Sequence, residues 1–322
     1  MEFNFFTFIF LFAILTSVLA LLWLNFRQDR AIKISFNEVP EGFNETITLE
    51  DHQKAGHYTQ AKLLANHFEI IFSTIVLLIW TLGGAMNWLD VFWHERISDP
   101  ILLGTVFILS IMMIASFIDL PFSIYRNFIL EEKFGFNRMT IKTFTGDLVK
   151  ELILTLALGI PLIYAILYLM NMSAIGDYWW IYVWAILSFF TITMMWIYPT
   201  FIAPIFNKFK PLENNSLRNR IDNLLDRTGF GNDGIFIMDG SKRSSHGNAY
   251  FTGIGKNKRI VFFDTLMKGM EEREIEAILA HELGHFHHKH VRQRIVSSFI
   301  FSLASLALLG YLIKQGWFFH GL

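Results

Sequence analysis

A short motif in the last fifth of the chain has the residue types and spacing of a metal-dependent hydrolytic site. His281-Glu282-Leu283-Gly284-His285 places two histidines four residues apart, and residues i and i+4 of an α-helix lie on one face. Both imidazoles can therefore bind a single Zn²⁺ ion, with Glu282 beside the first of them to take a proton from zinc-activated water. The motif predicts His281 and His285 as metal ligands and Glu282 as the general base.

An incidental histidine pair is the alternative interpretation of this motif. The apolar run of residues 275–280 immediately before it indicates a packed helix rather than a freely exposed one. A histidine pair with an intervening glutamate rarely arises by chance in that setting. The zinc interpretation is therefore favoured.

The third ligand of a tetrahedral zinc site is not evident in the sequence. After His290 the chain contains no Asp or Glu. His287 and His288, like His290, are expected on the same helix as the pair, where they fit a solvated basic helix end better than the metal. His320 lies beyond the last apolar stretch, on the far side of the membrane inferred below. The third ligand is expected upstream or absent.

The motif lies in a polar segment whose hydrophobic patterns predict a small α/β unit. Residues 271–292 are expected to form the helix that carries the motif, with acidic residues early and basic residues late, as suits the helix dipole. A second helix is predicted at 213–228, ending at Gly229. Strands are predicted at 234–238 and 259–263, and an extended segment at 248–252 closed by Gly253 and Gly255.

The rest of the chain is too apolar for a water-soluble protein. Of 322 residues, 53% are hydrophobic and only 17% are charged, whereas soluble domains carry about a quarter charged residues. The absence of cysteine excludes disulfides and Cys-based metal sites, and a net charge of −1 gives no sign of nucleic-acid binding. Six stretches are long enough to cross a bilayer, which needs about 20 residues: 3–24, 70–88, 101–122, 152–170, 179–205 and 295–312.

These stretches have two alternative interpretations. The first could be a signal peptide, but the residues that lead into it include Glu2 and no Lys or Arg, and the apolar run is too long for a signal-peptide core. The others could be buried core helices, which are usually shorter and more amphipathic. Six retained membrane spans are the favoured interpretation, and the lipid bilayer is then a partner of the chain.

The distribution of basic residues predicts the orientation. If the six stretches span, 25 of the 27 Lys and Arg residues fall on one side, and only Arg96 and Lys314 on the other. The first two loops decide the orientation, because the positive-inside bias applies to short loops. The motif is therefore expected to face the cytoplasm, with the N-terminus outside. A bacterial plasma membrane and the endoplasmic reticulum are not distinguished.

The sequence thus predicts a mainly α, multi-pass transmembrane helical protein with a small cytosolic α/β zinc-peptidase insertion. Residues 1–205 are expected to hold five membrane helices and their cytosolic loops. Residues 206–294 are expected to form the cytosolic metallopeptidase segment, and residues 295–322 the sixth membrane helix and the C-terminal end.

Several longer strings resemble one protein family. The chain is similar to the type I CAAX prenyl endopeptidase family of integral-membrane zinc metalloproteases, from about Val39 to about Val291. Besides the zinc motif, the strings that carry the resemblance are LPFSIYR at 120–126, EEKFGFN at 131–137, APIFNKF at 203–209, DGSKRSSH at 239–246, NAYFTG at 248–253, KRIV at 258–261 and DTL at 264–266.

The resemblance implies an architecture and a reaction. Members of the family have seven membrane helices around a water-filled chamber and cleave near the C-terminus of substrates, in eukaryotes after a prenylated cysteine. Their third zinc ligand is a glutamate on a helix after the seventh span. This sequence has six spans and lacks that helix, so it is expected to be a C-terminally truncated or incompletely recorded member. A natural inactive form is the alternative.

The resemblance also implies substrate contacts. Residues 248–252 resemble the edge strand that holds the substrate backbone by strand addition, so Asn248, Ala249 and Tyr250 are expected to bind substrate, with an ordinary hairpin strand as the alternative. His246 is expected either to stabilise an oxyanion or to cap a loop. Glu131, Glu132 and Lys133 are expected to line the chamber or to solvate its mouth.

One further charge stands inside an apolar stretch. A carboxylate is costly in a membrane unless it faces water or a partner, so Asp119 is expected either to pair with Arg126 or to have a functional role.

The predicted function is zinc-dependent hydrolysis of peptide bonds near the C-terminus of CAAX-type peptide or protein substrates, prenylated or not. One rival function is a membrane-protein quality-control zinc protease similar to the heat-shock branch of related peptidases. The other is a catalytically incomplete membrane chamber that binds without cleaving. Nucleic acid is not expected as a partner.

Overall fold

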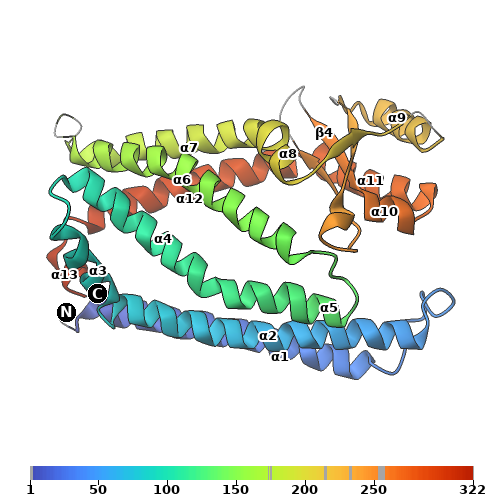
Figure 1. Cartoon of the computed structure of the whole chain (residues 1–322), viewed down its shortest axis with the longest axis horizontal. Helices are drawn as coiled ribbons and strands as arrows, with labels where there is room; N and C mark the ends of the chain where they lie inside the picture. Colours follow the sequence, from blue (N-terminus) through green and yellow to red (C-terminus); the bar gives the residue numbers. More distant parts are fainter. Residues whose placement is uncertain are drawn as a thin grey trace. The chain divides into compact units, whose positions relative to one another are not determined.

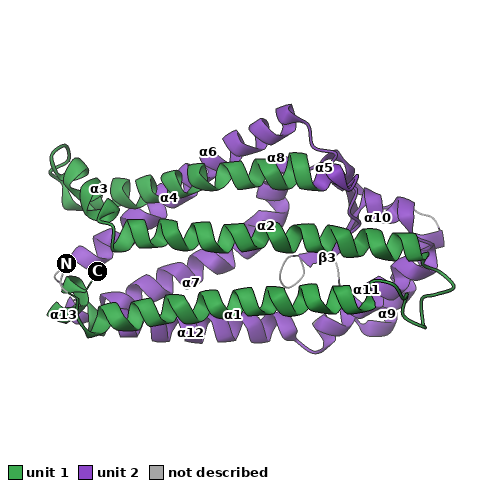
Figure 2. Ribbon diagram, turned by 90° about the horizontal axis from the view of Figure 1, so that it is seen from below, with its two compact units in different colours: residues 1–130, 311–322 green, residues 131–310 purple. Residues whose placement is uncertain are grey.

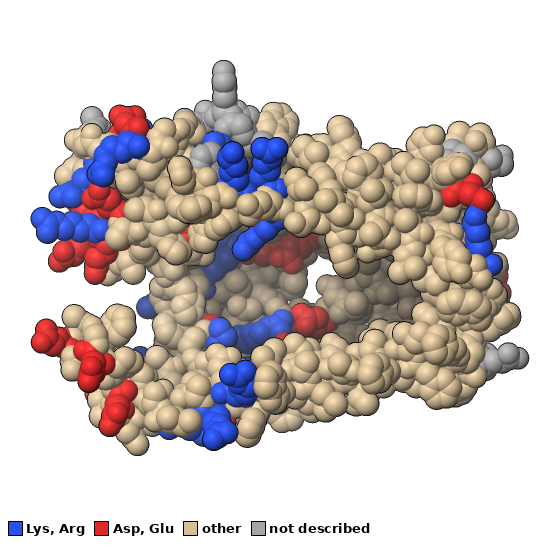
Figure 3. Space-filling model, turned by 180° about the vertical axis from the view of Figure 1, so that it is seen from behind, with Lys and Arg blue, Asp and Glu red and all other residues tan. Residues whose placement is uncertain are grey.

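The structure is a computed structural model that describes residues 3–172, 174, 176–213, 216–231, 234–252 and 258–321. Within these ranges six helical segments are long and apolar enough to cross a membrane, which confirms the predicted number. They are Phe5–Ser35, Leu49–Thr81, Pro100–Lys133, Ile141–Asn171, Gly176–Phe206 and His290–Leu312. On the face shown in Figure 3, wide areas of the surface carry no Lys, Arg, Asp or Glu.

The second span ends earlier than the sequence analysis predicted. Its helix stops at Thr81, and the chain turns through Gly84, whose φ of 78° is the left-handed conformation that favours glycine. Trp88, predicted at the end of that span, belongs instead to the next helix, α3 (Ala85–His94).

The chain forms two compact units, residues 1–130 with 311–322, and residues 131–310 (Figure 2). In the first unit α1 (Phe5–Ser35) lies along α2 (Leu49–Thr81), and α1 begins with a capping box formed by Asn4 and Thr7. The unit also contains α3, α4 (Pro100–Ile124), the π-helix η1 (Tyr125–Leu130) and α13 (Gly316–His320).

The ion pair proposed for Asp119 is present in the first unit. Arg126 lies 3.2 Å from Asp119 and 2.8 Å from Glu69 of α2, so two carboxylates share one guanidinium. The predicted ion pair between Asp119 and Arg126 is therefore confirmed. The pairing offsets the cost of placing these charges in an apolar span.

The second unit combines membrane helices with a small sheet (Figure 1). Trp184 of α7 donates a hydrogen bond to the Phe299 carbonyl of α12, at 2.9 Å. The helical elements of this unit are α5 (Glu131–Lys133), α6 (Ile141–Asn171), η2 (Gly176–Tyr178), α7 (Trp179–Ile197), η3 (Tyr198–Ile202), α8 (Ala203–Phe206), α9 (Ser216–Thr228), η4 (Gly240–Lys242), α10 (Asp264–Gly269), α11 (Glu272–His287) and most of α12 (His290–Leu312).

The sheet in the described ranges has four strands in the order β1-β2-β4-β3. They are β1 (Phe209–Pro211), β2 (Ile235–Met238), β3 (Ala249–Thr252) and β4 (Arg259–Phe263). β2 and β4 are parallel, and the other two pairs are antiparallel. One face of the sheet packs with α9 and α11 into the core that contains Ile221, Phe262 and Leu279.

The predicted elements of this region are largely confirmed. β2, β3 and β4 match the expected strands to within a residue, and α9 ends before Gly229, whose φ is 64°. Gly253 and Gly255, predicted to close the extended segment, lie outside the described residues.

The prediction of one continuous helix at 271–292 is wrong. The segment divides into α11, which ends at His287, and α12, which begins at His290. Lys289 between them has a φ of 56°, a left-handed conformation that no regular helix accommodates.

Candidate metal centre and substrate strand

The motif His281–His285 lies on α11 with its two histidines turned away from the core. Ile275, Leu279 and Leu283 form a buried stripe at helical spacing, whereas His281 and His285 are exposed. Their ring centroids are 5.0 Å apart. The apolar stripe thus determines which face of the helix packs on the core. The histidine pair on the other face is left accessible to a metal ion.

His290 is brought back to the motif by the turn at Lys289. Its Nδ1 lies 2.8 Å from Nδ1 of His285, a hydrogen bond in which one of the two nitrogens donates. The expectation that His290 shares a helix with the pair is therefore wrong. The sequence carries only a weak signal for this contact, namely a histidine five residues after the motif.

This hydrogen bond fits a metal-binding role for His285. Histidines that bind a metal through one ring nitrogen usually hold the other in a hydrogen bond, which fixes the orientation of the ring. With Nδ1 of His285 bonded to His290, Nε2 is the nitrogen available to a metal. The donor set is incomplete, since no group of three or more metal-ligating side chains occurs among the described residues. The observed residues fit two ligands of a zinc site.

β3 is the candidate substrate strand, and it lies at the edge of the sheet. It pairs with β4 on one side, and in the described part of the chain no strand pairs with its other edge. α11 packs beside β3. A peptide added to this edge would therefore run close to the helix that carries the motif.

The predicted substrate residues Asn248, Ala249 and Tyr250 differ in their exposure and in the side of the sheet to which their side chains point. Asn248 is exposed, and its side-chain oxygen accepts a hydrogen bond from the Ala249 backbone N–H at 2.8 Å. Ala249 packs on the core shared with α11. Because side chains alternate along a strand, Tyr250 points to the opposite face.

Tyr250 lines a small pocket on that opposite face of the sheet. Its hydroxyl lies 3.8 Å from Sδ of Met238, and its ring meets that of Phe263 edge-on. The Phe263 backbone N–H donates to the Asn248 carbonyl, and the direction of the backbone groups alternates along an antiparallel ladder. The backbone of Tyr250 therefore faces β4, whereas that of Ala249 faces the open edge. The pocket is lined by Tyr198, Pro199, Phe209, Phe236, Tyr250, Thr252, Arg259 and Val261.

Tyr250 is expected to titrate far above the ordinary range of tyrosine. Burial, and then the nearby Tyr198, raises the pKa of Tyr250 from 10.0 to about 12. Between these values the folded protein keeps a proton that the unfolded chain has lost, so the free energy of unfolding falls as the pH rises through this window. Tyrosinate absorbance of the wild type minus that of Tyr250→Phe measures the midpoint. A midpoint near 10 would contradict the burial argument.

His246 is fixed by two contacts within the second unit. Its Nε2 lies 3.0 Å from Oε2 of Glu131, and its ring stacks on Phe136 with centroids 4.3 Å apart. Glu131 therefore has a defined partner, as does Glu132, which accepts a hydrogen bond from Asn137 at 2.9 Å. These contacts link the 131–137 segment to the loop before β3.

Comparisons with known proteins agree with this description. Residues 28–208 match the family described as "CAAX prenyl protease N-terminal, five membrane helices", and residues 211–318 match "Peptidase family M48". A CAAX prenyl protease 1 homolog of Dictyostelium discoideum is 37% identical over 284 residues, covering 85% of this chain and 65% of that protein. CAAX prenyl protease 1 of Saccharomyces cerevisiae is 34% identical over 312 residues, covering 92% and 67%.

A solved structure is similar as well. The crystal structure of S. mikatae Ste24p matches with a TM-score of 0.86 and 32% identity, over 97% of this chain and 74% of that one. The six candidate membrane helices and the match to a peptidase family place the chain in the class of multi-pass membrane metallopeptidases, whose members require a metal cofactor. The chain belongs to the type I CAAX prenyl protease family. It spans about two thirds of the length of the curated relatives described above.

Proposed function

We propose that this chain provides the zinc-binding helix and the substrate strand of a membrane-embedded endopeptidase that cleaves near the C-terminus of CAAX-type substrates. The observation that carries the proposal is the packing of α11 beside the edge strand β3. A peptide bound along β3 by backbone hydrogen bonds would present its own carbonyl groups to the exposed face of α11. The names of the relatives, CAAX prenyl proteases, support the choice of substrate.

In this proposal His281 and His285 hold a zinc ion, with a carboxylate from outside the described residues as the third ligand. The ion supplies Lewis-acid chemistry when bound, polarising the scissile carbonyl and making water acidic. Glu282, half-buried between the two histidines, takes the proton from the attacking water and passes it to the leaving amine. Asn248, Ala249 and Tyr250 form the substrate-binding segment, in which Ala249 offers its backbone N–H and C=O at the open edge and Asn248 an exposed side chain. His246 lies in the loop that leads into them.

The arrangement in the membrane is also part of the proposal. Residues 1–205 contribute five membrane helices, 206–294 the peptidase segment, and 295–322 the sixth membrane helix and the C-terminal end. The peptidase segment faces the cytoplasm, because 25 of the 27 Lys and Arg residues then lie on that side.

The full chain, purified in lipid nanodiscs with zinc, tests the proposal. We expect it to cleave a farnesylated CAAX peptide, and to lose that activity when a zinc chelator is added. A non-prenylated peptide of the same sequence and an unfolded membrane protein serve as parallel substrates. Faster cleavage of the unfolded protein would favour a quality-control protease.

The metal content of the same preparation distinguishes a protein that binds without cleaving. This rival has one observation in its favour, the incomplete donor set among the described residues. Zinc below about a tenth of an equivalent, together with no cleavage, would overturn the proposed activity.

A further inference from the structure

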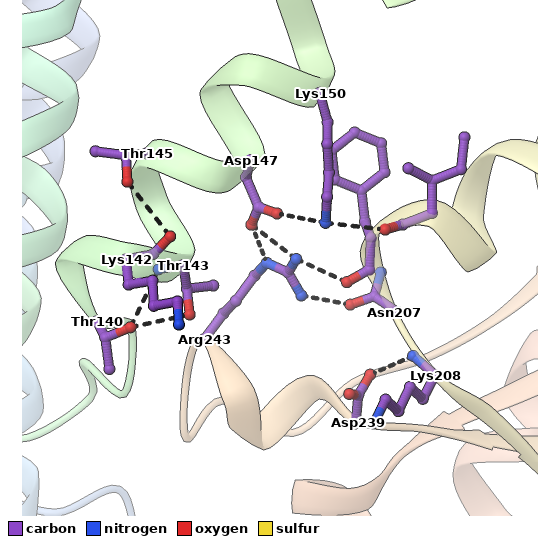
Figure 4. Close-up of polar contacts among 12 residues, drawn as sticks. Thr140, Lys142, Thr143, Thr145, Asp147, Lys150, Asn207, Lys208, Asp239 and Arg243 are labelled. Carbon is purple, nitrogen blue, oxygen red and sulfur yellow. Dashed lines mark hydrogen bonds and ion pairs between the residues drawn. The ribbon is translucent and has the colours of Figure 1, made fainter.

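The loop of residues 239–248, here called the anchor loop, connects β2 to the substrate strand and is tied to several distant segments. Arg243 is its central residue, and its side chain is only partly exposed. Figure 4 shows its polar contacts. Nε of Arg243 donates to Oδ2 of Asp147 at 2.8 Å, and Nη2 lies 2.7 Å from the same carboxylate oxygen. Asp147 belongs to α6 and is buried.

The other donors of Arg243 reach a different segment. Nη1 donates to Oδ1 of Asn207 at 2.6 Å, and Nη2 donates to the Phe206 carbonyl at 2.8 Å, at the end of α8 (Figure 4). Lys150 reinforces the arrangement, because its Nζ lies 3.5 Å from Asp147 and 3.0 Å from the Ile205 carbonyl. One planar guanidinium thus joins α6, the end of α8 and the anchor loop.

Further bonds hold the anchor loop on both sides of Arg243. Asp239 accepts a hydrogen bond from the Lys208 backbone N–H at 2.7 Å (Figure 4), and the Ser241 backbone N–H donates to Asp264 at 2.8 Å. Burial alone would raise the pKa of Asp264, but the hydrogen bonds from Ser241 hold that pKa below its ordinary value. The Ser245 backbone N–H donates to the Phe136 carbonyl at 3.0 Å.

The position of the substrate strand follows from these bonds. Arg243 lies five residues before Asn248 in the chain, with His246 between them. The outer edge of β3 has no pairing strand in the described ranges, so β4 fixes it from one side only. The anchor loop supplies the constraint at the start of the strand.

We propose that Arg243, held by Asp147, is a positioning residue that fixes the entry of β3 and so places a strand-bound peptide relative to Glu282. The inference rests on the proposed function and goes beyond it, because neither residue belongs to β3 or to the zinc motif. Arginine suits the role, since its rigid fork can donate to Asp147, Asn207 and Phe206 together, whereas lysine presents a single flexible charge.

Hydrogen–deuterium exchange of the full chain in nanodiscs tests the positioning without relying on activity. We expect Arg243→Gln and Asp147→Asn to speed exchange in residues 244–252 about tenfold, while residues 235–238 of β2, which pair with β1 and β4 but not with β3, stay unchanged. Arg218→Gln is the matched control, because Arg218 also bonds an aspartate, Asp222, at 2.9 Å but within α9. It should leave residues 244–252 unaffected. Equal exchange in Arg243→Gln and wild type overturns the proposal.

Cleavage rates of two proteins on two peptides test whether Arg243 affects the position of the bound substrate. Peptides that each carry one N-methyl group on the backbone are first compared with the wild-type protein. The peptide whose methyl group lowers kcat/KM the most is chosen, because it cannot form all its backbone hydrogen bonds to β3. We expect Arg243→Gln to lower kcat/KM for the unmodified peptide about tenfold or more, and for the methylated peptide less than about twofold. Equal losses for both peptides would indicate a general structural role and overturn the proposal.

Two results need a separate treatment: a variant that does not fold, and a wild-type protein that does not cleave. If Arg243→Gln yields no monodisperse protein, Arg243→Lys is measured in its place; it keeps the charge beside Asp147 but not the fork, and should speed exchange in residues 244–252 about threefold or more. An unchanged Arg243→Lys would overturn the proposal. If the wild type cleaves neither peptide, the proposed activity fails, and the exchange experiment alone decides the role of Arg243.

Discussion

Glu282→Gln is expected to abolish peptide cleavage while the protein keeps its metal. The amide is isosteric with the carboxylate but accepts no proton at neutral pH, so neither the proton transfer from water nor the transfer to the leaving amine can occur. General acid–base catalysis contributes about 10²- to 10⁴-fold, and because Glu282 performs both transfers we expect kcat to fall at least about 10³-fold. Peptide cleavage and zinc content are measured on the same preparation.

Glu276→Gln is the matched control for this experiment. Glu276 lies on the same helix, where it pairs with Arg220 at 3.2 Å rather than standing beside a histidine of the motif. It should change kcat less than about twofold, because Glu276 takes no part in the proposed proton transfers and a partly exposed ion pair contributes little to stability. Cleavage by Glu282→Gln at the wild-type rate would remove Glu282 from the mechanism.

His281→Ala and His285→Ala are each expected to lose the metal. A site that has two of its protein ligands on one helix keeps only one of them after either change, so zinc should fall below about a tenth of an equivalent. Cleavage should fall with it. Zinc is measured by atomic emission after dialysis, and thermal unfolding shows whether the helix survives, since neither exposed histidine is part of the buried stripe of α11.

Variants of two neighbouring histidines serve as a control and as a test of the hydrogen bond to His285. His287→Ala should retain the wild-type zinc content, because this exposed residue ends α11 outside the motif. His290→Ala removes the hydrogen bond to Nδ1 of His285 and should weaken zinc affinity about 10- to 100-fold without abolishing it. Full zinc occupancy in His285→Ala would contradict the assigned ligands, and unchanged affinity in His290→Ala would contradict the orienting role of that bond.

Properties that depend on residue spacing could be predicted from the sequence. Six apolar stretches predict six long helices because bilayer thickness fixes their length. The motif predicts that His281 and His285 share a face because helix geometry is local. The strands β2 and β4 follow from short apolar runs bounded by turn residues.

Properties that depend on contacts between distant segments could not be predicted in this way. Nothing in the local pattern indicates that Arg243 meets Asp147, which is 96 residues earlier in the chain, or that His246 stacks on Phe136. The strings EEKFGFN, APIFNKF and DGSKRSSH resemble a family individually, and the structure brings the first two against the anchor loop, which contains the third. Their shared role is a property of packing.

The sequence by itself therefore determined the membrane class, the placing of His281, Glu282 and His285 on one helix, and the existence of the strand β3. These follow from side-chain type and from the fixed periods of helix and strand. Only the tertiary structure decided that a left-handed Lys289 returns His290 to the motif, and that Tyr250 faces away from α11. The physical reason is that a turn and a sheet face are chosen by long-range packing, which residue spacing does not encode.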